Sequence, residues 1–259
     1  MPSEIVHQQT PEEAELLRKR EELASVRATL AERELELADL RAQLKGFEGR
    51  YLRQVGVLYA ELDEWSARIA ELEASRDTTP AAQQRADEAR KRADGTHEAT
   101  HGETSQTQDF QPSADLKNLF REVAKRIHPD FAKDAADQQR RTRLMAQAND
   151  AYSRGDVETL QRILDDYRES SESVQGEGIG AELIRIIRQI HQARKNIAAI
   201  EKELNSLRTS EIAQLKQNTK AAQQEGRDLL AELAADVRER VAGLEKKHKT
   251  LVVELKNHG

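Results

Sequence analysis

The sequence predicts an all-α fold in which long coiled-coil helices flank a small helical hairpin domain. Two observations predict it. Apolar residues recur at steps of three, four and seven along most of the chain, which is the spacing of helices that bury one face. Of the 259 residues, 37% are hydrophobic, 3% aromatic and 34% charged, a balance typical of long helices and too polar for one compact globule of this size.

The first coiled coil is expected over residues 11–78, after a frayed terminus at residues 1–10. The helix begins at Pro11, with glutamates in its first turn. Every seventh residue is then large and apolar, which indicates a coiled-coil seam: Leu16, Leu23, Leu30, Leu37, Leu44, Tyr51, Leu58, Trp65 and Leu72. We therefore expect the chain to form a homo-oligomer through its coiled coils.

The second apolar stripe of this helix changes side near Tyr51. Val26, Leu40 and Phe47 lie three residues after a heptad position, whereas Val55, Leu62 and Ile69 lie four after one. The switch amounts to a four-residue insertion, and such a stutter locally relaxes a supercoil. The segment from Phe47 to Leu62 either seats a second copy of this helix, which is the favoured interpretation, or holds a folded partner.

Residues 79–112 are predicted to be a flexible linker. Ala81 to Asp94 could be helical but has almost nothing to bury, and Gly95 to Asp109 has the composition of a disordered segment. His97 and His101 have the spacing of a metal-binding pair. The chain has no cysteine and no organised acidic residues beside them, so we expect solvated side chains, and neither a metal nor a cofactor.

Residues 113–168 are expected to form the small helical domain. Ser113 is a suitable N-cap for a helix that ends before Pro129, because the residue preceding a proline is driven away from helical dihedrals. Lys117, Arg121 and Lys125 lie four apart on the outer side of that helix, with Arg126 beside them, and predict one positive stripe. The expected core residues are Leu116, Phe120, Ala124, Ile127, Met145, Ala148 and Tyr152. His128, Pro129 and Asp130 would then lie at the exposed tip of a two-helix hairpin.

This arrangement resembles the J-domain of the DnaJ family of co-chaperones, whose hallmark is a His-Pro-Asp loop between two antiparallel helices, the first of them basic. The resemblance covers roughly a fifth of the chain. The matching residues are Ser113, Leu116, Lys117, Phe120, Arg121, Ala124, His128, Pro129 and Asp130, followed by Asn149, Ala151 and Tyr152 of the Asn-x-Ala-Tyr pattern. The tripeptide is specific only in this context, because three residues alone recur by chance.

The chain also departs from the family pattern. Nothing before Ser113 supplies the short first helix with its Tyr-x-x-Leu motif, and only Phe110 is available. Glu122 stands where the family often has a base, and Phe131 and Ala132 replace the usual basic and asparagine residues. The second helix breaks at Gly155, after which Asp156 suits the N-cap of a further helix containing Val157, Leu160, Ile163 and Leu164. We expect that helix to cover the core left open by the missing one.

The remaining chain is expected to form a hinge over residues 169–180 and a second coiled coil over residues 181–257. This tract either runs on as one rod or folds back as a hairpin. The rod is favoured, because no proline or strong turn dipeptide forces a reversal. His191 and His248 lie on it without acidic neighbours and are expected to be solvated or in the seam.

The resemblance implies a co-chaperone that binds a DnaK-type heat-shock chaperone and stimulates its ATPase. His128, Pro129 and Asp130 would make the specific contacts, while Lys117, Arg121, Lys125 and Arg126 would complement an acidic surface. The coiled coils would serve oligomerisation or hold a client or assembly that the sequence does not identify. The alternative is a structural coiled-coil scaffold with a degenerate J-like domain.

Other classes of function are not expected. A hairpin tip offers neither the pocket nor the nucleophile of an enzyme, so we predict no catalytic residue. The net charge of −6, with both signs mixed throughout, argues against nucleic-acid binding. No apolar run is long enough to span a membrane, the acidic amino terminus does not resemble a signal peptide, and the absence of cysteine fits a reducing cytosol. We expect a cytoplasmic protein.

Overall fold

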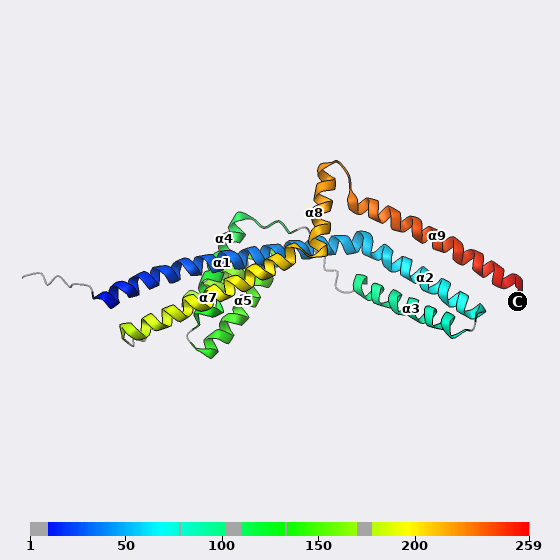
Figure 1. Ribbon diagram of the computed structural model, residues 1–259. Coiled ribbons are helices and arrows are strands. Elements are labelled where there is room, and N and C mark those ends of the chain that lie inside the picture. The colour runs from blue at the N-terminus through cyan, green and yellow to red at the C-terminus, as the bar shows by residue number, and fades with distance from the viewer. Residues whose placement is uncertain (1–9, 78, 102–109, 133, 170–177, 259) are drawn as a thin grey trace, which may run out of the picture. The chain divides into compact units, whose positions relative to one another are not determined.

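The computed structural model describes residues 10–77, 79–101, 110–132, 134–169 and 178–258, and the regular structure in these ranges is entirely helical (Figure 1). The prediction of an all-α fold is confirmed. The elements are α1 (Pro11–Tyr51), the π-helix η1 (Leu52–Gly56), α2 (Val57–Arg76), α3 (Pro80–His101), α4 (Ala114–Ile127), the 3₁₀-helix η2 (Pro129–Phe131), α5 (Ala135–Arg154), α6 (Val157–Glu169), α7 (Ile179–Arg208), α8 (Glu211–Gln224) and α9 (Leu229–His258). They form two compact units, Met1–Ala42 with Phe110–Thr209, and Gln43–Asp109 with Ser210–Gly259.

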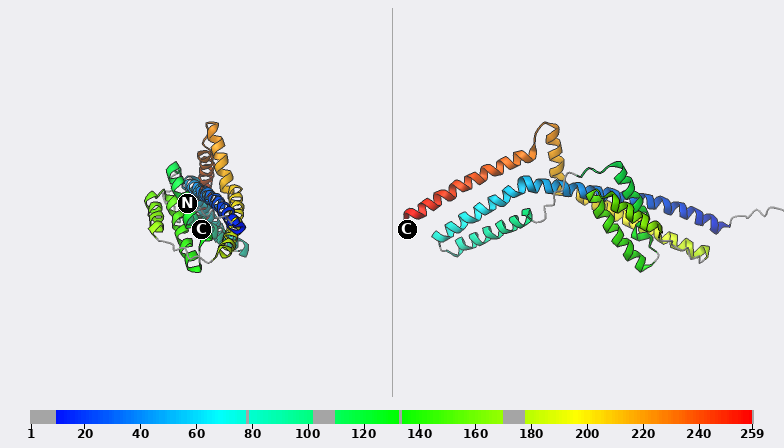
Figure 2. Two further views of the ribbon diagram at one scale, coloured as in Figure 1. Left: turned by 90° about the vertical axis from the view of Figure 1, so that its left-hand side faces the viewer. Right: turned by 180° about the vertical axis from the view of Figure 1, so that it is seen from behind.

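In the first unit, α1 and α7 lie side by side and run in the same direction (Figures 1 and 2). The ion pairs Arg20–Glu182, at 2.6 Å, and Arg33–Glu201, at 3.3 Å, flank their contact. The α1–α7 seam buries Leu16, Leu23, Leu30, Leu37, Ile186, Ile190, Ala193, Ile200 and Leu204. The heptad leucines that suggested a second copy are thus covered by a helix of the same chain, and homo-oligomerisation stays a prediction.

The small domain consists of α4, α5 and α6, which pack on one another and lie beside α1 and α7 in the view from behind (Figure 2). Its ends follow local signals. The Ser113 hydroxyl accepts a hydrogen bond from the Leu116 N–H at 3.1 Å, and Gly155 ends α5 with a φ of 71°. The Asp156 carboxylate accepts from the Thr159 N–H at 2.9 Å and caps α6. These boundaries are the ones that the sequence indicates.

One buried cluster forms the core of this domain. It contains the seven core residues expected from the sequence, together with Val123, Ala151, Leu160, Ile163 and Leu164. Val157, expected in the same core, is instead 50% exposed. The cluster also contains Ala31, Leu35 and Ala38 of α1, so α6 covers only part of the open core and α1 covers the rest. Two of these three residues are alanines, which add little to the apolar pattern of the sequence.

The second unit contradicts the prediction of a flexible linker at residues 79–112. Helix α3 occupies Pro80–His101 and packs against α2. Ala82, Ala86 and Ala93 are buried, and Arg90 pairs with Glu64 at 2.7 Å and with Glu71 at 2.8 Å. A stripe of small side chains suffices when the helices approach closely, which is why low hydrophobicity misled the prediction. Residues 102–109 of the expected linker lie outside the described residues.

The π-helix η1 lies where the sequence places the stutter, and the π-helix, which is rare in proteins, occurs mostly as a single turn inside an α-helix. A Cβ on Gly56 would lie 3.0 Å from Leu52 Cδ2 and 3.3 Å from Thr100 Cγ2, so the glycine allows α3 to approach. Phe47 and Val55 are buried with residues of α9. The segment from Phe47 to Leu62 is therefore covered by the chain's own carboxyl-terminal helices, and not by a second copy as favoured from the sequence.

The prediction of one carboxyl-terminal rod is wrong. Helix α7 ends at Arg208, and the Ser210 hydroxyl caps α8 by accepting from the Ala213 N–H at 3.4 Å. Between α8 and α9, Gly226 has a φ of 78°. Serine N-caps and glycines in the left-handed conformation are common at helix ends, and apolar periodicity does not reveal them. Of the expected hinge, residues 170–177 lie outside the described part of the chain. Within the described ranges, no helix combines the length and the apolar character needed to cross a membrane.

Candidate functional site at the His-Pro-Asp turn

The His-Pro-Asp tripeptide forms the connection between two antiparallel helices. Helix α4 ends at Ile127, and His128, with a ψ of 131°, leads into η2. Helix α5 then returns along α4. At the turn, Arg141 Nη1 donates to the Arg126 carbonyl at 2.8 Å, and farther along the Phe120 and Tyr152 rings lie 4.7 Å apart. The hairpin expected from the sequence is therefore present, with the tripeptide at its bend.

Arg141, which the sequence analysis did not single out, holds this bend together. The residue is 2% exposed, and its Nε donates to Asp137 Oδ2 at 2.8 Å. Its bond to Arg126 satisfies one of the carbonyls that the end of α4 leaves open. The spacing of Asp137 and Arg141 predicts a pair on one helix, but nothing in the sequence indicates that the arginine is buried.

The His128 side chain is 4% exposed and is held from both sides. The Asp130 backbone N–H donates to Nδ1 at 3.2 Å, so this nitrogen is the acceptor. Nε2 then carries the proton and donates to Glu34 Oε1 of α1 at 3.2 Å. The contacts together fit the neutral imidazole with the proton on Nε2.

The Asp130 side chain is 6% exposed. Its Oδ1 accepts from Asn196 Nδ2 of α7 at 2.5 Å, while Oδ2 makes no hydrogen bond with the described residues and lies 3.6 Å from His128 Nδ1. Burial raises the pKa of Asp130 above its ordinary value, although the hydrogen bond from Asn196 acts in the opposite direction. A buried carboxylate with one unbonded oxygen is costly to the fold.

The expectation of an exposed tip is therefore wrong, although the bend itself is present. His128 and Asp130 face α1 and α7, and Phe131 joins the α1–α7 seam. The Phe131 ring lies under the guanidinium of Arg27, whose Cζ is 4.2 Å from the ring centroid. Because Glu34 precedes His128 by 94 residues, no local pattern could reveal this cover.

The predicted positive stripe of α4 is divided between α1 and solvent. Lys117 Nζ lies 3.1 Å from Asp39 Oδ2, and Arg121 Nε donates to Glu32 Oε2 at 2.5 Å. The hydrogen bond from Arg121 lowers the pKa of Glu32. Lys125 is exposed, and Arg126, 3.9 Å from Glu122, is 41% exposed in its side chain. The first two cations thus lie against α1, and not on the outer side as expected.

Helix α1 presents a matching surface to the hairpin, which we call the α1 docking strip. It consists of the apolar Ala31, Leu35 and Ala38 and the acidic Glu32, Glu34 and Asp39. The acids lie on both sides of the apolar stripe, so that cations of α4 meet one edge and His128 meets the other.

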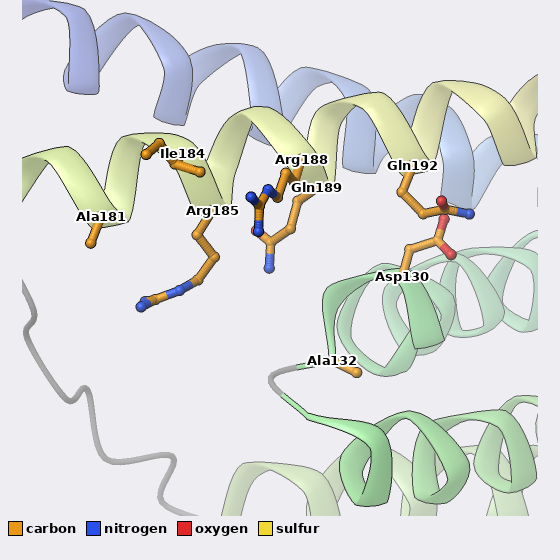
Figure 3. A pocket seen from close by; sticks show the side chains of 8 residues that line it. All are labelled: Asp130, Ala132, Ala181, Ile184, Arg185, Arg188, Gln189 and Gln192. Carbon is orange, nitrogen blue, oxygen red and sulfur yellow. The ribbon is translucent and has the colours of Figure 1, made fainter.

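A pocket of about 580 Å³ opens beside Asp130, between the turn and α7 (Figure 3). The Asp130 and Gln192 side chains lie at one end, Arg185 projects from α7 toward the gap, and Arg188 also lines it. Neither arginine forms an ion pair with the described residues. The lining is Asp130, Ala132, Ala181, Ile184, Arg185, Arg188, Gln189 and Gln192. It offers no hydroxyl or thiol nucleophile, and no group of three or more potential metal ligands occurs among the described side chains.

Comparisons of the chain with models of protein families, with curated proteins and with solved structures give no match. The functional assignment therefore depends on the residues and geometry described above.

Proposed function

We propose that this chain is a J-domain-like co-chaperone that binds a DnaK-type heat-shock chaperone and stimulates its ATPase. The observation that carries the proposal is the α4–α5 hairpin, with His128, Pro129 and Asp130 at its bend and four cations on α4. The co-chaperone would act in the cytoplasm and serve a client that is not yet identified.

Each part of the turn has a physical role in this proposal. Pro129 holds the bend, and Asp130 retains one carboxylate oxygen without a hydrogen bond. That oxygen suits a cation of the partner, because a buried charge gains most from a charged, hydrogen-bonded neighbour. Lys125 and Arg126 remain exposed and would speed encounter with an acidic surface. Lys117 and Arg121 would join them when their pairs with α1 open.

A steady-state ATPase assay with a DnaK-type chaperone tests the proposal. Stimulation by the intact chain should be lost in the variants Asp130→Asn and His128→Gln. Asp150→Asn is the matched control, because Asp150 lies on the exposed side of α5 and pairs only with Arg154 at 2.7 Å in the described structure. The proposal would be refuted if neither the wild-type chain nor variants in which the hairpin is released from α1 raise the ATPase rate.

The second candidate is a structural scaffold in which the hairpin is a packing module. The burial of His128 and Asp130 favours it, because both side chains hydrogen-bond within the chain. Pull-down from a lysate discriminates between the two functions. A co-chaperone should recover a DnaK-type chaperone in an ATP-dependent manner that Asp130→Asn abolishes, whereas a scaffold should recover none.

A further inference from the structure

We infer that the α1 docking strip is an internal competitor for the chaperone-binding face of the hairpin, so that the first unit is an autoinhibited state. The inference rests on the proposed function and adds its regulation. In this state α1 and α7 occupy the groups that a partner would contact, and stimulation requires that the turn separate from them.

Charged side chains of α1 already pair with the cations of α4. An acidic partner surface would pair with the cations of α4, and α1 already supplies such a surface through Asp39 and Glu32. The Arg121 and Glu32 side chains are 36% and 55% exposed, and ion pairs so accessible to water are weak. At Arg121, a partner of the same charge can therefore replace Glu32 without breaking a strong ion pair.

The polar groups at the tip of the hairpin are bonded within the chain. While His128 Nε2 bonds to Glu34 and Asp130 Oδ1 bonds to Asn196, neither group can make the same bond to a partner. The acceptor Glu34 belongs to α1 and the donor Asn196 belongs to α7, so both helices must move relative to the turn. A pocket lined by Asp130 opens beside this contact (Figure 3).

Residue 131, directly after the tripeptide, is a phenylalanine in this chain. A basic side chain, usual at this position in the resembled family, could not fill the α1–α7 seam, whereas Phe131 is 5% exposed there. Phe131 is therefore both a departure from the family pattern and the residue that packs the turn into the α1–α7 seam. An apolar anchor beside a polar motif is what an internal docking site requires.

The hairpin can retain its own core after release. All but three of the buried residues in its cluster come from α4, α5 and α6, and the three from α1 include two alanines. Removal of α1 therefore exposes a narrow stripe and leaves the main contacts between the three helices in place.

The test uses the intact chain with the variant Glu32→Lys/Asp39→Lys, which places like charges opposite Arg121 and Lys117. The matched control is Glu15→Lys/Glu21→Lys, which makes the same charge change on the half-exposed Glu15 and the exposed Glu21 of α1, neither of which pairs with α4 in the described structure. Phe131→Lys is a second, independent release variant. The readouts are amide hydrogen exchange over residues 113–131 and stimulation of a DnaK-type ATPase at subsaturating concentration.

Both release variants should exchange faster than wild type over residues 113–131. If about a tenth of the wild-type chains are open, stimulation should rise about tenfold, because apparent affinity scales with the competent fraction. The gain should vanish when Asp130→Asn is added. The inference would be overturned if the wild-type chain stimulates the ATPase and the release variants exchange faster but stimulate no more than it does. It would also be overturned if hydrogen exchange over residues 113–131 is unchanged in both release variants. Faster exchange without stimulation by any chain would instead refute the co-chaperone function itself.

Discussion

His128 and Glu34 form a hydrogen bond of 3.2 Å between residues 94 positions apart in the sequence. The histidine side chain is 4% exposed and the glutamate side chain 16%. Because the Asp130 N–H occupies Nδ1, Glu34 is the acceptor that satisfies the remaining ring nitrogen. The bond ties the tip of the hairpin to α1, and the first prediction follows from it.

Replacement of Glu34 should loosen the hairpin from α1, and the effect should be larger when the new side chain cannot accept a hydrogen bond. Glu34→Ala leaves a buried ring N–H without a partner and should lower the free energy of opening by about 1–3 kcal/mol. Glu34→Gln keeps a carbonyl acceptor and should cost less than about 1 kcal/mol. Hydrogen exchange in α4 is the suitable measurement, because the single tryptophan, Trp65, lies in the other unit. Equal effects of the two variants would contradict the bond.

Asp130→Asn should stabilise the first unit at pH 7 while it abolishes chaperone stimulation. Burial raises the pKa of Asp130 above its ordinary value of 3.8, so the folded chain binds this proton more tightly than the unfolded chain. The contribution of Asp130 to stability is therefore most favourable below pH 3.8 and declines as pH rises through the folded pKa. The advantage of the asparagine variant in exchange experiments should be larger at pH 7 than at pH 4. A variant less stable than wild type at pH 7 would be evidence against this account.

Phe131 should be a strong anchor of the turn. Phe131→Ala removes a buried ring from the α1–α7 seam and should cost about 3–5 kcal/mol in the first unit. Phe131→Leu keeps most of the apolar volume and should cost about 1.5 kcal/mol or less. Limited proteolysis near the turn and hydrogen exchange both report the effect. If alanine and leucine are equally tolerated, the ring does not anchor the turn.

Arg141 and Arg140 provide a comparison of a buried and an exposed arginine on the same carboxylate. Both pair with Asp137, at 2.8 Å and 2.9 Å, but their side chains are 3% and 46% exposed. Arg141→Ala leaves the Arg126 carbonyl without its side-chain donor and removes the buried partner of Asp137, and should cost about 1–3 kcal/mol. Arg140→Ala should cost less than about 1 kcal/mol. Exchange protection of α5 measures both, and a reversed order would show that Arg141 does not hold the bend.

Two glycines of the second unit should respond in opposite directions. Gly56→Val places side-chain atoms against Leu52 and Thr100 and should destabilise this unit by about 1–3 kcal/mol. Gly95 lies within α3 with no neighbour inside 4 Å of an added Cβ, so Gly95→Ala should stabilise it by about 0.5–1 kcal/mol. Urea denaturation followed by Trp65 fluorescence reports on this unit. No gain from Gly95→Ala would argue against a folded α3.

The sequence by itself determined the helical class and the local anatomy of the hairpin. Ser113, Pro129, Gly155 and Asp156 mark helix ends through bonds within a few residues, so their types and spacing suffice. The core of α4 and α5 follows from apolar residues at steps of three and four for the same reason. The heptad leucines of α1 correctly indicate a buried face, but not which helix covers it.

Only the tertiary structure decided that the His-Pro-Asp turn is covered, that α3 is a packed helix and that α7 fills the α1 seam. The cover of the turn and the filling of the α1 seam depend on contacts between segments far apart in the chain, such as Glu34 with His128 or Phe131 with the α1–α7 seam. Apolar periodicity states that a face will be buried but carries no information about its partner. Helix α3 packs on the preceding helix α2 through a stripe of alanines, which gives little hydrophobic signal because its value lies in the close approach that small side chains allow.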